Sequence, residues 1–403
     1  MFYKCNLFNI YICNYIFIME FTSLFNQFKC SALNGRYITN SHIEPILEKL
    51  PSSFKVKQIG HSVKNLPIHS LFFGHGNIKV LMWSQMHGNE ATTTKALFDL
   101  LNFLSSNNEL ALQIASQFTL QIIPILNPDG AAAYTRVNAN TIDLNRDSVN
   151  LSQPESKLLR EQIDLFKPNY CLNLHDQRTI FGTKNHNLPA TVSFLAPSYN
   201  EKREINNVRE HAMQLIASIN QVLQQYIPNQ VGRFDDDFNI NCIGDMCTSL
   251  NIPTILFEAG HFPNDYQREE TRKYIFISYL AFFNTFLTKS YLSYKTIDYM
   301  NIPENSKCFF DVLYNNFKLS VGNLKKPFKF AIQYQEELIE NDIIFVAKVS
   351  EIDNLENHLG HIEYDLANVE VVDFDLDNFK IGEIANFKIN EKHKIVNGLL
   401  INE

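Results

Sequence analysis

The chain has 403 residues, 45% of them hydrophobic and 19% charged, which is enough apolar material for one large globular domain and a smaller one. Its formal charge of −8 comes with no basic patch, so nucleic acid is not an expected partner. The seven cysteines form no CxxC pair, which favours reduced thiols in a cytoplasmic protein over a disulfide framework.

The first eighteen residues form an apolar and aromatic stretch that asparagines interrupt. Residues 2–18 are too short and too polar for a membrane-spanning helix, and they lack the basic start and small-residue cleavage site of a signal peptide. More ordinary sequence begins at Met19. We therefore predict that residues 1–18 are a non-native or disordered extension, and we expect no membrane partner.

The first predicted elements surround a histidine and a glutamate. Alternating residues over 54–73 predict a β-hairpin, the apolar run 78–83 predicts a strand, and leucines at helical spacing predict a helix over 91–104. His87 and Glu90 therefore lie where a strand passes into a helix, the position at which open α/β sheets place their ligand crevices. An imidazole and a carboxylate three residues apart in such a turn can bind one metal ion.

Strands and helices continue to alternate as far as residue 287. In order, they are a strand at 119–126, a turn at Asn127-Pro128-Asp129-Gly130, an irregular loop at 131–151, a capping-box helix at 152–166, strands at 170–174 and 191–196, a helix at 201–225, a strand at 254–257 and an amphipathic helix at 266–287. This alternation predicts a three-layer α/β/α sandwich with a mostly parallel mixed sheet. We expect it to form one domain over residues 19–300.

The sequence changes character after residue 305, where short strands follow one another with little helix between them. The expected strands are at 309–321, 328–334, 343–349, 361–374 and 381–389. They predict a separate small all-β domain over residues 305–403.

Two of the predicted strands deliver side chains that suit metal-assisted hydrolysis. A catalytic zinc ion typically takes three protein ligands and leaves a fourth position for water, and His87, Glu90 and His175 supply such a set. Asp176 or a nearby carbonyl could orient one of these ligands. Glu258 leaves a buried strand, where partial desolvation raises the pKa of a carboxylate, and it is the candidate general base. The alternatives are ordinary strand-end histidines and a solvated glutamate.

Polar residues in the irregular loop could contact a substrate. Arg136 could donate a hydrogen bond to the oxyanion of a tetrahedral intermediate. Asn145 and Arg146 suit a clamp on a substrate carboxylate, although a surface charge is the alternative role for each arginine. Cys242 and Cys247 could approach the site, but burial as small hydrophobic residues is the favoured interpretation.

Taken in this order, the motifs resemble the zinc carboxypeptidase family, and in particular its shorter bacterial members, over about residues 54–287. The resemblance is carried by His87-x-x-Glu90, Asn127-Pro128-Asp129-Gly130, Arg136, Asp143-Leu144-Asn145-Arg146, His175 and Thr254-x-x-x-Glu258. It implies an α/β/α catalytic domain with one zinc ion. It also implies a role for each residue: metal ligand for His87, Glu90 and His175, general base for Glu258, carbonyl polariser for Arg136, and anchor of a C-terminal carboxylate for Asn145 with Arg146.

The chain departs from the family pattern in one loop. Well-known members carry a substrate-capping tyrosine in a mobile loop before the catalytic glutamate, but residues 232–239 contain phenylalanine and no tyrosine. Tyr226 is the nearest tyrosine upstream and is expected in or just after the long helix. Without the phenol, closure over the substrate would be weaker. Arg233 and Asp235–Asp237 either line the pocket or form a hydrated acidic loop.

Two other functions share part of this pattern. A zinc deacylase of the succinylglutamate desuccinylase and aspartoacylase type has the same His-x-x-Glu, Asp-Leu-Asn-Arg and His elements, and it removes an N-acyl group from an amino acid. The Asn127–Gly130 motif and Arg136 favour the carboxypeptidases. An inactive zinc-binding module would not need a base opposite the zinc ion. The expected partner is thus a peptide or, as the alternative, an N-acyl amino acid; no sequence feature sets an oligomeric state.

Overall fold

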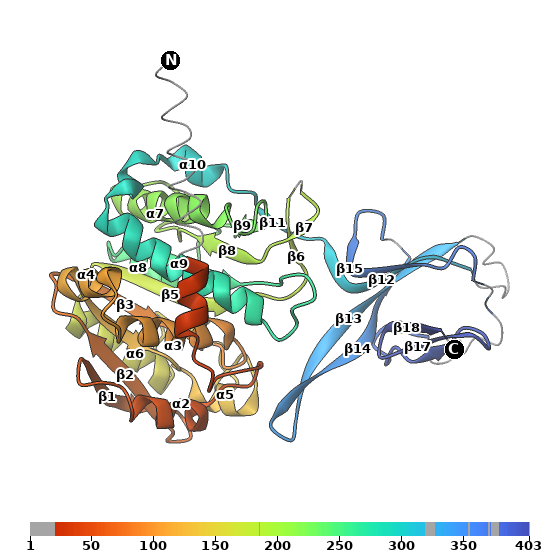
Figure 1. Cartoon of the computed structure of the whole chain (residues 1–403), viewed down its shortest axis with the longest axis horizontal. Coiled ribbons are helices and arrows are strands. Elements are labelled where there is room, and N and C mark those ends of the chain that lie inside the picture. Colours follow the sequence, from red (N-terminus) through yellow and green to blue (C-terminus); the bar gives the residue numbers. More distant parts are fainter. Residues whose placement is uncertain are drawn as a thin grey trace, which may run out of the picture. The chain divides into compact units, whose positions relative to one another are not determined.

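The computed structural model describes residues 21–402 except 185, 319–326, 354, 370 and 372–378. The extension expected at 1–18 lies outside the described residues, as do the ends of two expected strands, at 319–321 and 372–374. The chain divides into two compact units (Figure 1). The first unit comprises the described parts of Met1–Gln177 and Thr183–Asn305, and the second comprises those of Arg178–Gly182 and Ser306–Glu403.

An eight-stranded mixed sheet with the order β1-β2-β4-β3-β5-β10-β8-β9 forms the centre of the first unit. Its strands are β1 (Phe54–His61), β2 (Pro67–Phe73), β3 (Ile78–Trp83), β4 (Phe118–Ile123), β5 (Tyr170–Asp176), β8 (Val192–Leu195), β9 (Val231–Arg233) and β10 (Thr254–Ala259). The strands β4, β3, β5 and β10 are parallel neighbours, whereas β1 with β2 forms the expected antiparallel hairpin. The carboxyl ends of β3, β5 and β10 consequently meet at one edge of the sheet.

Helices cover both faces of this sheet (Figure 1). They are α2 (Asn40–Leu47), α3 (Thr92–Leu104), α4 (Glu109–Gln117), α5 (Pro128–Ala133), α6 (Pro154–Phe166), α7 (Asn207–Leu223), α8 (Ile243–Ser249), α9 (Glu269–Leu287) and α10 (Thr296–Met300), with short 3-10 turns η1 (Leu144–Arg146) and η2 (Ser290–Ser293) and a further helical stretch at 21–28. Val80 and Met82 of β3 pack with α3 and α9, whereas Leu81 and Trp83 pack with α6 and α8. A strand that buries both of its faces requires helices on both sides of the sheet. The predicted α/β/α fold is therefore confirmed.

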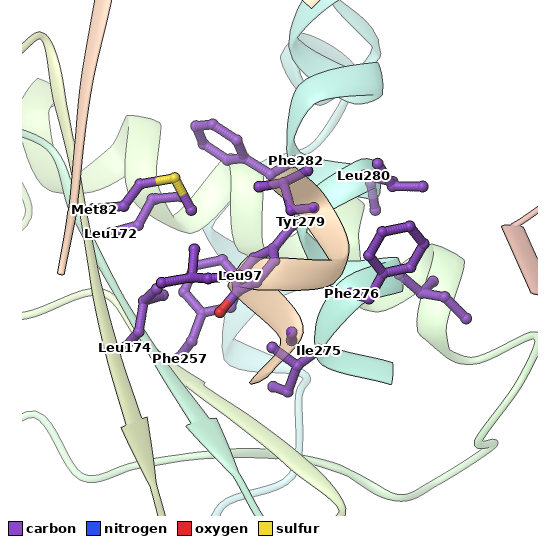
Figure 2. Packing of buried hydrophobic residues seen from close by; sticks show 14 of the residues in the cluster. Met82, Leu97, Leu172, Leu174, Phe257, Ile275, Phe276, Tyr279, Leu280 and Phe282 are labelled. Atoms are coloured by element: carbon purple, nitrogen blue, oxygen red, sulfur yellow. The ribbon is translucent and has the colours of Figure 1, made fainter. Parts of the chain in front are cut away.

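The apolar contacts of the central strands fix the part of the sheet that carries the candidate site. Figure 2 shows Leu172, Leu174 and Phe257 on β5 and β10 packed against Leu97 of α3 and Tyr279 of α9. The rings of Phe257 and Tyr279 lie 5.6 Å apart between centroids. Burial of one such side chain contributes about 1.5–3 kcal/mol, so several of them together hold the two strands firmly in register.

Three helices begin later than the sequence predicted, each at a point where a nearby side chain binds the N–H groups at the helix start. The expected capping box at residue 152 is wrong: the N-cap of α6 is Gln153, and the Asp147 carboxylate accepts hydrogen bonds from Ser152 and from the N–H of Gln153. Helix α7 begins late, after Asn206, whose side chain caps it. Helix α9 likewise begins only at residue 269, where the Asp265 carboxylate binds its first N–H groups. The expected irregular loop also contains the end of α5 and the turn η1.

The second unit contains two small sheets. Their orders are β14-β13-β12-β15 and β16-β17-β18. The strands are β12 (Phe309–Phe317), β13 (Phe328–Ile339), β14 (Asp342–Ile352), β15 (Leu359–Asp365), β16 (Phe387–Lys388), β17 (His393–Val396) and β18 (Leu399–Asn402). Three further short strands of the chain are β6 (Phe181–Thr183), β7 (Leu188–Pro189) and β11 (Asn305–Lys307). Aromatic rings fill the core of this unit, with Tyr314 stacked on Phe330 at 4.5 Å. Its described residues contain strands and no helix, as the all-β prediction requires.

Within the described part of the chain, no helix combines the length and the apolar character needed to cross a membrane.

Candidate metal centre

The turn that carries His87 and Glu90 follows β3 and precedes α3. The N–H of Glu90 donates to the carbonyl oxygen of His87 at 3.1 Å, which closes the turn. Asn127 braces it from the end of the neighbouring strand: its N–H donates to the carbonyl oxygen of Gln85 at 3.0 Å, and its Nδ2 donates to that of Met86 at 3.2 Å. The turn is thus held by backbone contacts that no local sequence signal reveals.

Two glycines allow these segments to pack backbone against backbone. A Cβ atom on Gly88 would lie 1.9 Å from the carbonyl carbon of Gly130, so only glycine fits at this position. Asn127-Pro128-Asp129-Gly130 was expected as a simple turn, but it forms the start of α5 with proline in the first helical turn. Its contribution to the site is to support the turn that carries His87.

Two histidines and a glutamate bring their ligand atoms together. His87 Nδ1 lies 2.8 Å from Glu90 Oε1, and His175 Nδ1 lies 2.8 Å from Glu90 Oε2. The two Nδ1 atoms are 3.0 Å apart, and each residue offers one ligand atom within 4.8 Å of the others. All three side chains are buried. The structure therefore unites the three residues that the sequence analysis proposed as metal ligands, although 85 residues separate Glu90 from His175.

This donor set fits a zinc ion. Two imidazole nitrogens and one carboxylate form a recognised set for catalytic zinc, and the 3.0 Å between the nitrogens is close to the roughly 3.3 Å expected for two ligands at a tetrahedral zinc ion. His87 Nε2 lies 3.1 Å from Asp143 Oδ1. A proton on Nε2 that donates to this carboxylate leaves Nδ1 free to bind a cation.

Glu258 lies beside this group. In the parallel pair β5–β10 the Cα partner of Glu258 is His175, so both side chains project from the same face of the sheet. Both β5 and β10 run two residues further than the sequence suggested. His175 and Glu258 therefore lie within strands, and the sheet holds their backbones in place. Burial, together with the carboxylates of Glu90 and Asp176, raises the pKa of Glu258 well above its usual range.

Asp143 connects the ligands to the polar loop. Its carboxylate accepts from Arg136 Nε at 3.0 Å and from the N–H of Asn145 at 2.9 Å, in addition to its contact with His87. Burial would raise the pKa of Asp143, but the hydrogen bonds from His87 and Arg136 outweigh it and hold this pKa well below its usual range. Arg136 is half exposed, and its Nη1 also lies 3.3 Å from Glu90 Oε1. Arg136 therefore lies between the donor set and solvent.

Asn145 and Arg146 lie on the turn η1, next to the start of α8. Asn145 Oδ1 accepts from the N–H of Ile243 at 2.9 Å, which fixes the side chain of Asn145 against the start of α8. Arg146 Nη1 donates to the carbonyl oxygen of Asn145 at 2.7 Å and lies 3.1 Å from Cys242 Sγ. Asn145, Arg146 and Cys242 thus form one contact group, which the N–H of Asn145 joins to Asp143.

The loop between β9 and α8 does not supply a capping phenol. Tyr226 follows α7 and packs, partly buried, against the hydrophobic core. Arg233 Nη2 donates to Glu304 Oε1 at 3.0 Å, and Asp236 forms an ion pair with the buried Arg209. These ion pairs give Arg233 and Asp236 a structural role, which neither of the two sequence interpretations, pocket lining or hydrated acidic loop, had proposed.

From the sequence, no role was predicted for Asp143, and burial as a small hydrophobic residue was favoured for Cys242, which is only partly buried. Asp143 had a usable signal, because it directly precedes the proposed anchor residues in a polar motif. Cys242 had none, because its contact with Arg146 spans 96 residues of sequence.

The site places a buried His/Glu/His donor set and a neighbouring, mostly buried carboxylate at the carboxyl-end edge of a mixed α/β sheet. This is the arrangement of a metal-dependent hydrolase.

Comparisons with known proteins agree with this class. The family model described as Zinc carboxypeptidase matches residues 39–156. Probable carboxypeptidase 2 of Arthroderma benhamiae is 29% identical over 100 residues, which cover 24% of this chain and 19% of the relative. Carboxypeptidase SOL1 of Arabidopsis thaliana is 30% identical over 150 residues, which cover 32% of this chain and 30% of the relative. The chain thus spans less than a third of either relative.

Among solved structures, a metallo-carboxypeptidase from Pseudomonas aeruginosa has a TM-score of 0.51 at 15% identity, covering 63% of this chain and 70% of the other. Likeness at this level of identity supports the fold alone. The resemblance to the zinc carboxypeptidase family that the sequence motifs indicate is confirmed by the family match and by this shared fold.

Proposed function

We propose that the chain is a zinc-dependent hydrolase that cleaves the C-terminal peptide bond of its substrate. One zinc ion is held by His87, Glu90 and His175. The observation that supports this most is the convergence of their ligand atoms within 4.8 Å, next to the strand neighbour Glu258. Metal-assisted hydrolysis combines a Lewis acid with a base, and this part of the sheet offers groups for both roles.

A zinc ion bound there would polarise the scissile carbonyl and lower the pKa of the attacking water. Glu258 accepts a proton from that water as the oxygen adds to the carbonyl carbon, and it returns the proton to the amine as the C–N bond breaks. The products are a carboxylic acid and a free amine. The raised pKa of Glu258 favours the proton-carrying form needed for the second step, and a nearby dication would counteract the rise enough to keep the base available.

Residues of the polar loop would bind the oxyanion at the reacting carbonyl group and the C-terminal carboxylate of the substrate. Arg136, oriented by Asp143, donates to the oxyanion that forms when water adds to the carbonyl. Asn145 and the exposed Arg146 bind the C-terminal carboxylate, which selects the last residue of a peptide. The guanidinium groups of Arg136 and Arg146 favour a substrate with a negatively charged C-terminal carboxylate over one with a neutral C-terminal amide.

The named relatives are carboxypeptidases, and neither an N-acyl amino acid deacylase nor an inactive binding module gains support from them. A cytoplasmic location stays a prediction from cysteine usage.

Purified protein would be assayed for zinc content and then for release of C-terminal residues from peptides with a free or an amidated C-terminus, in parallel with N-acyl amino acids. We expect zinc at one ion per chain and cleavage of the free-carboxylate peptides. Cleavage of N-acyl amino acids alone would replace the peptidase assignment with a deacylase. Zinc binding without turnover of any substrate would favour the binding module.

The Glu258→Gln variant tests the base. We expect it to keep its zinc and lose at least about 100-fold in kcat, the scale of general acid–base catalysis. Glu155→Gln is the matched control: Glu155 is a buried glutamate bound by the N–H of Val63 and by Asn138, and its replacement leaves turnover intact. Full activity of Glu258→Gln would remove Glu258 from the mechanism.

A further inference from the structure

Asp176 makes contacts with both segments that carry the proposed ligands. It is the last residue of β5, directly follows His175, and is 8% exposed. Its carboxylate accepts hydrogen bonds from the N–H groups of Thr92 at 2.8 Å and Thr93 at 3.3 Å. These are the first two residues of α3, which begins two residues after Glu90.

Helix α3 has no side-chain cap of its own. Its N-cap residue, Ala91, has no hydrogen-bond acceptor in its side chain, although the first N–H groups of a buried helix need acceptors. Asp176 supplies these acceptors from a different strand, and its negative charge is favourable at the positive end of the helix dipole. The start of α3 is therefore fixed to the carboxyl end of β5.

The backbone of Asp176 also contacts a proposed ligand. Its N–H donates to Glu90 Oε2 at 3.2 Å, and the same oxygen lies 2.8 Å from His175 Nδ1. Asp176 consequently holds Glu90 in two ways: directly through its amide, and indirectly through the helix start that determines the path of the Glu90 backbone.

We propose that Asp176 is a positioning residue that presets the metal centre by fixing Glu90 against His175. This inference rests on the proposed metal-dependent function. Asp176 acts through a ligand and has no contact with substrate in this role. Its loss therefore lowers the affinity for zinc, and kcat at saturating zinc changes much less.

Asp265 offers a matched control. It is a second buried aspartate that caps a helix from outside, because its carboxylate accepts from the N–H groups of Glu269, Glu270 and Thr271 at the start of α9. Among the described residues its carboxylate binds no proposed ligand. Asp265→Ala thus removes a buried cap of the same kind without disturbing the metal centre.

The test uses full-length Asp176→Ala, Asp176→Asn and Asp265→Ala. Zinc affinity is measured by competition with a chromophoric chelator, and the free energy of unfolding of each metal-free protein is measured in urea. We expect Asp176→Ala to bind zinc about 10–100-fold more weakly, and Asp265→Ala to stay within about twofold of the wild type, although both variants are destabilised. Asp176→Asn keeps one acceptor oxygen and the amide, so its affinity falls between those two.

Wild-type zinc affinity in folded Asp176→Ala would overturn the inference. An equal loss of affinity in Asp265→Ala would overturn it as well, because general destabilisation would then explain both. If Asp176→Ala does not fold, the comparison of Asp176→Asn with Asp265→Ala decides in the same way: equal affinities refute the positioning role. Absence of zinc binding in the wild type would refute the proposed function instead.

Discussion

Replacement of Asp143 by alanine should damage the metal centre and the substrate anchor together. The carboxylate orients His87 through its contact with Nε2 at 3.1 Å, and outer partners of this kind typically account for 10–100-fold in metal affinity, or about 1.4–2.7 kcal/mol. It also holds Arg136 at 3.0 Å and caps the turn that carries Asn145. We therefore expect weaker zinc binding, and a further loss of roughly tenfold in kcat/KM even at saturating zinc.

The control for this prediction is Asp143→Asn. Its amide oxygen can still accept a hydrogen bond from His87, but the negative charge that attracts Arg136 is lost. Zinc affinity by chelator competition and kcat/KM on a free-carboxylate peptide separate the two effects: we expect near-normal affinity with a reduced kcat/KM. Wild-type zinc affinity in Asp143→Ala would show that this carboxylate does not orient the ligand, and the reasoning from the contact distance would fail.

Two further predictions concern stability. Asp99 and Arg272 form a fully buried ion pair at 2.6 Å. Asp99→Ala leaves the buried guanidinium with Glu269, at 3.1 Å, as its remaining carboxylate partner among the described residues, and it should cost about 3 kcal/mol in urea denaturation; a loss under about 1 kcal/mol would contradict this. Burial raises the pKa of Asp245 to about 6, so the folded protein loses stability as the pH rises from about 4 to about 6. Asp245→Asn lacks this loss and should gain up to about 3 kcal/mol at pH 7.5 but nothing at pH 4. A gain independent of pH would refute the titration argument.

The positions of the proposed ligands could be predicted because each belongs to a strong local pattern. Apolar runs end directly before His175 and Glu258, and an apolar run with a following helix brackets His87. Since parallel strands align their carboxyl ends at one edge, strand assignment alone brings such side chains together. The fold class followed from the same alternation of strands and helices, and it is confirmed.

The supporting contacts could not be predicted, because no pattern at the helix starts or in the loops marks them. Asp265 and Asp147 cap helices across loops, whereas capping signals are sought at the helix start itself. The short helix α8 has no periodic signal, yet the N–H of Ile243 at its start fixes the side chain of Asn145. Such contacts depend on tertiary structure, which no local pattern encodes.

The most informative comparison is between Asp143 and Asp176, because they contact the proposed metal centre through different ligands. Asp143 reaches a ligand through the imidazole of His87 and also binds the loop that would hold substrate. Asp176 reaches Glu90 through backbone groups and the start of α3, and it binds no residue of that loop in the described structure. Both alanine variants should therefore lose zinc affinity, but only the change at Asp143 should also lower kcat/KM at saturating zinc. If both variants recovered full activity with excess zinc, the metal site and the substrate anchor would be energetically independent, and Asp143 would not link them.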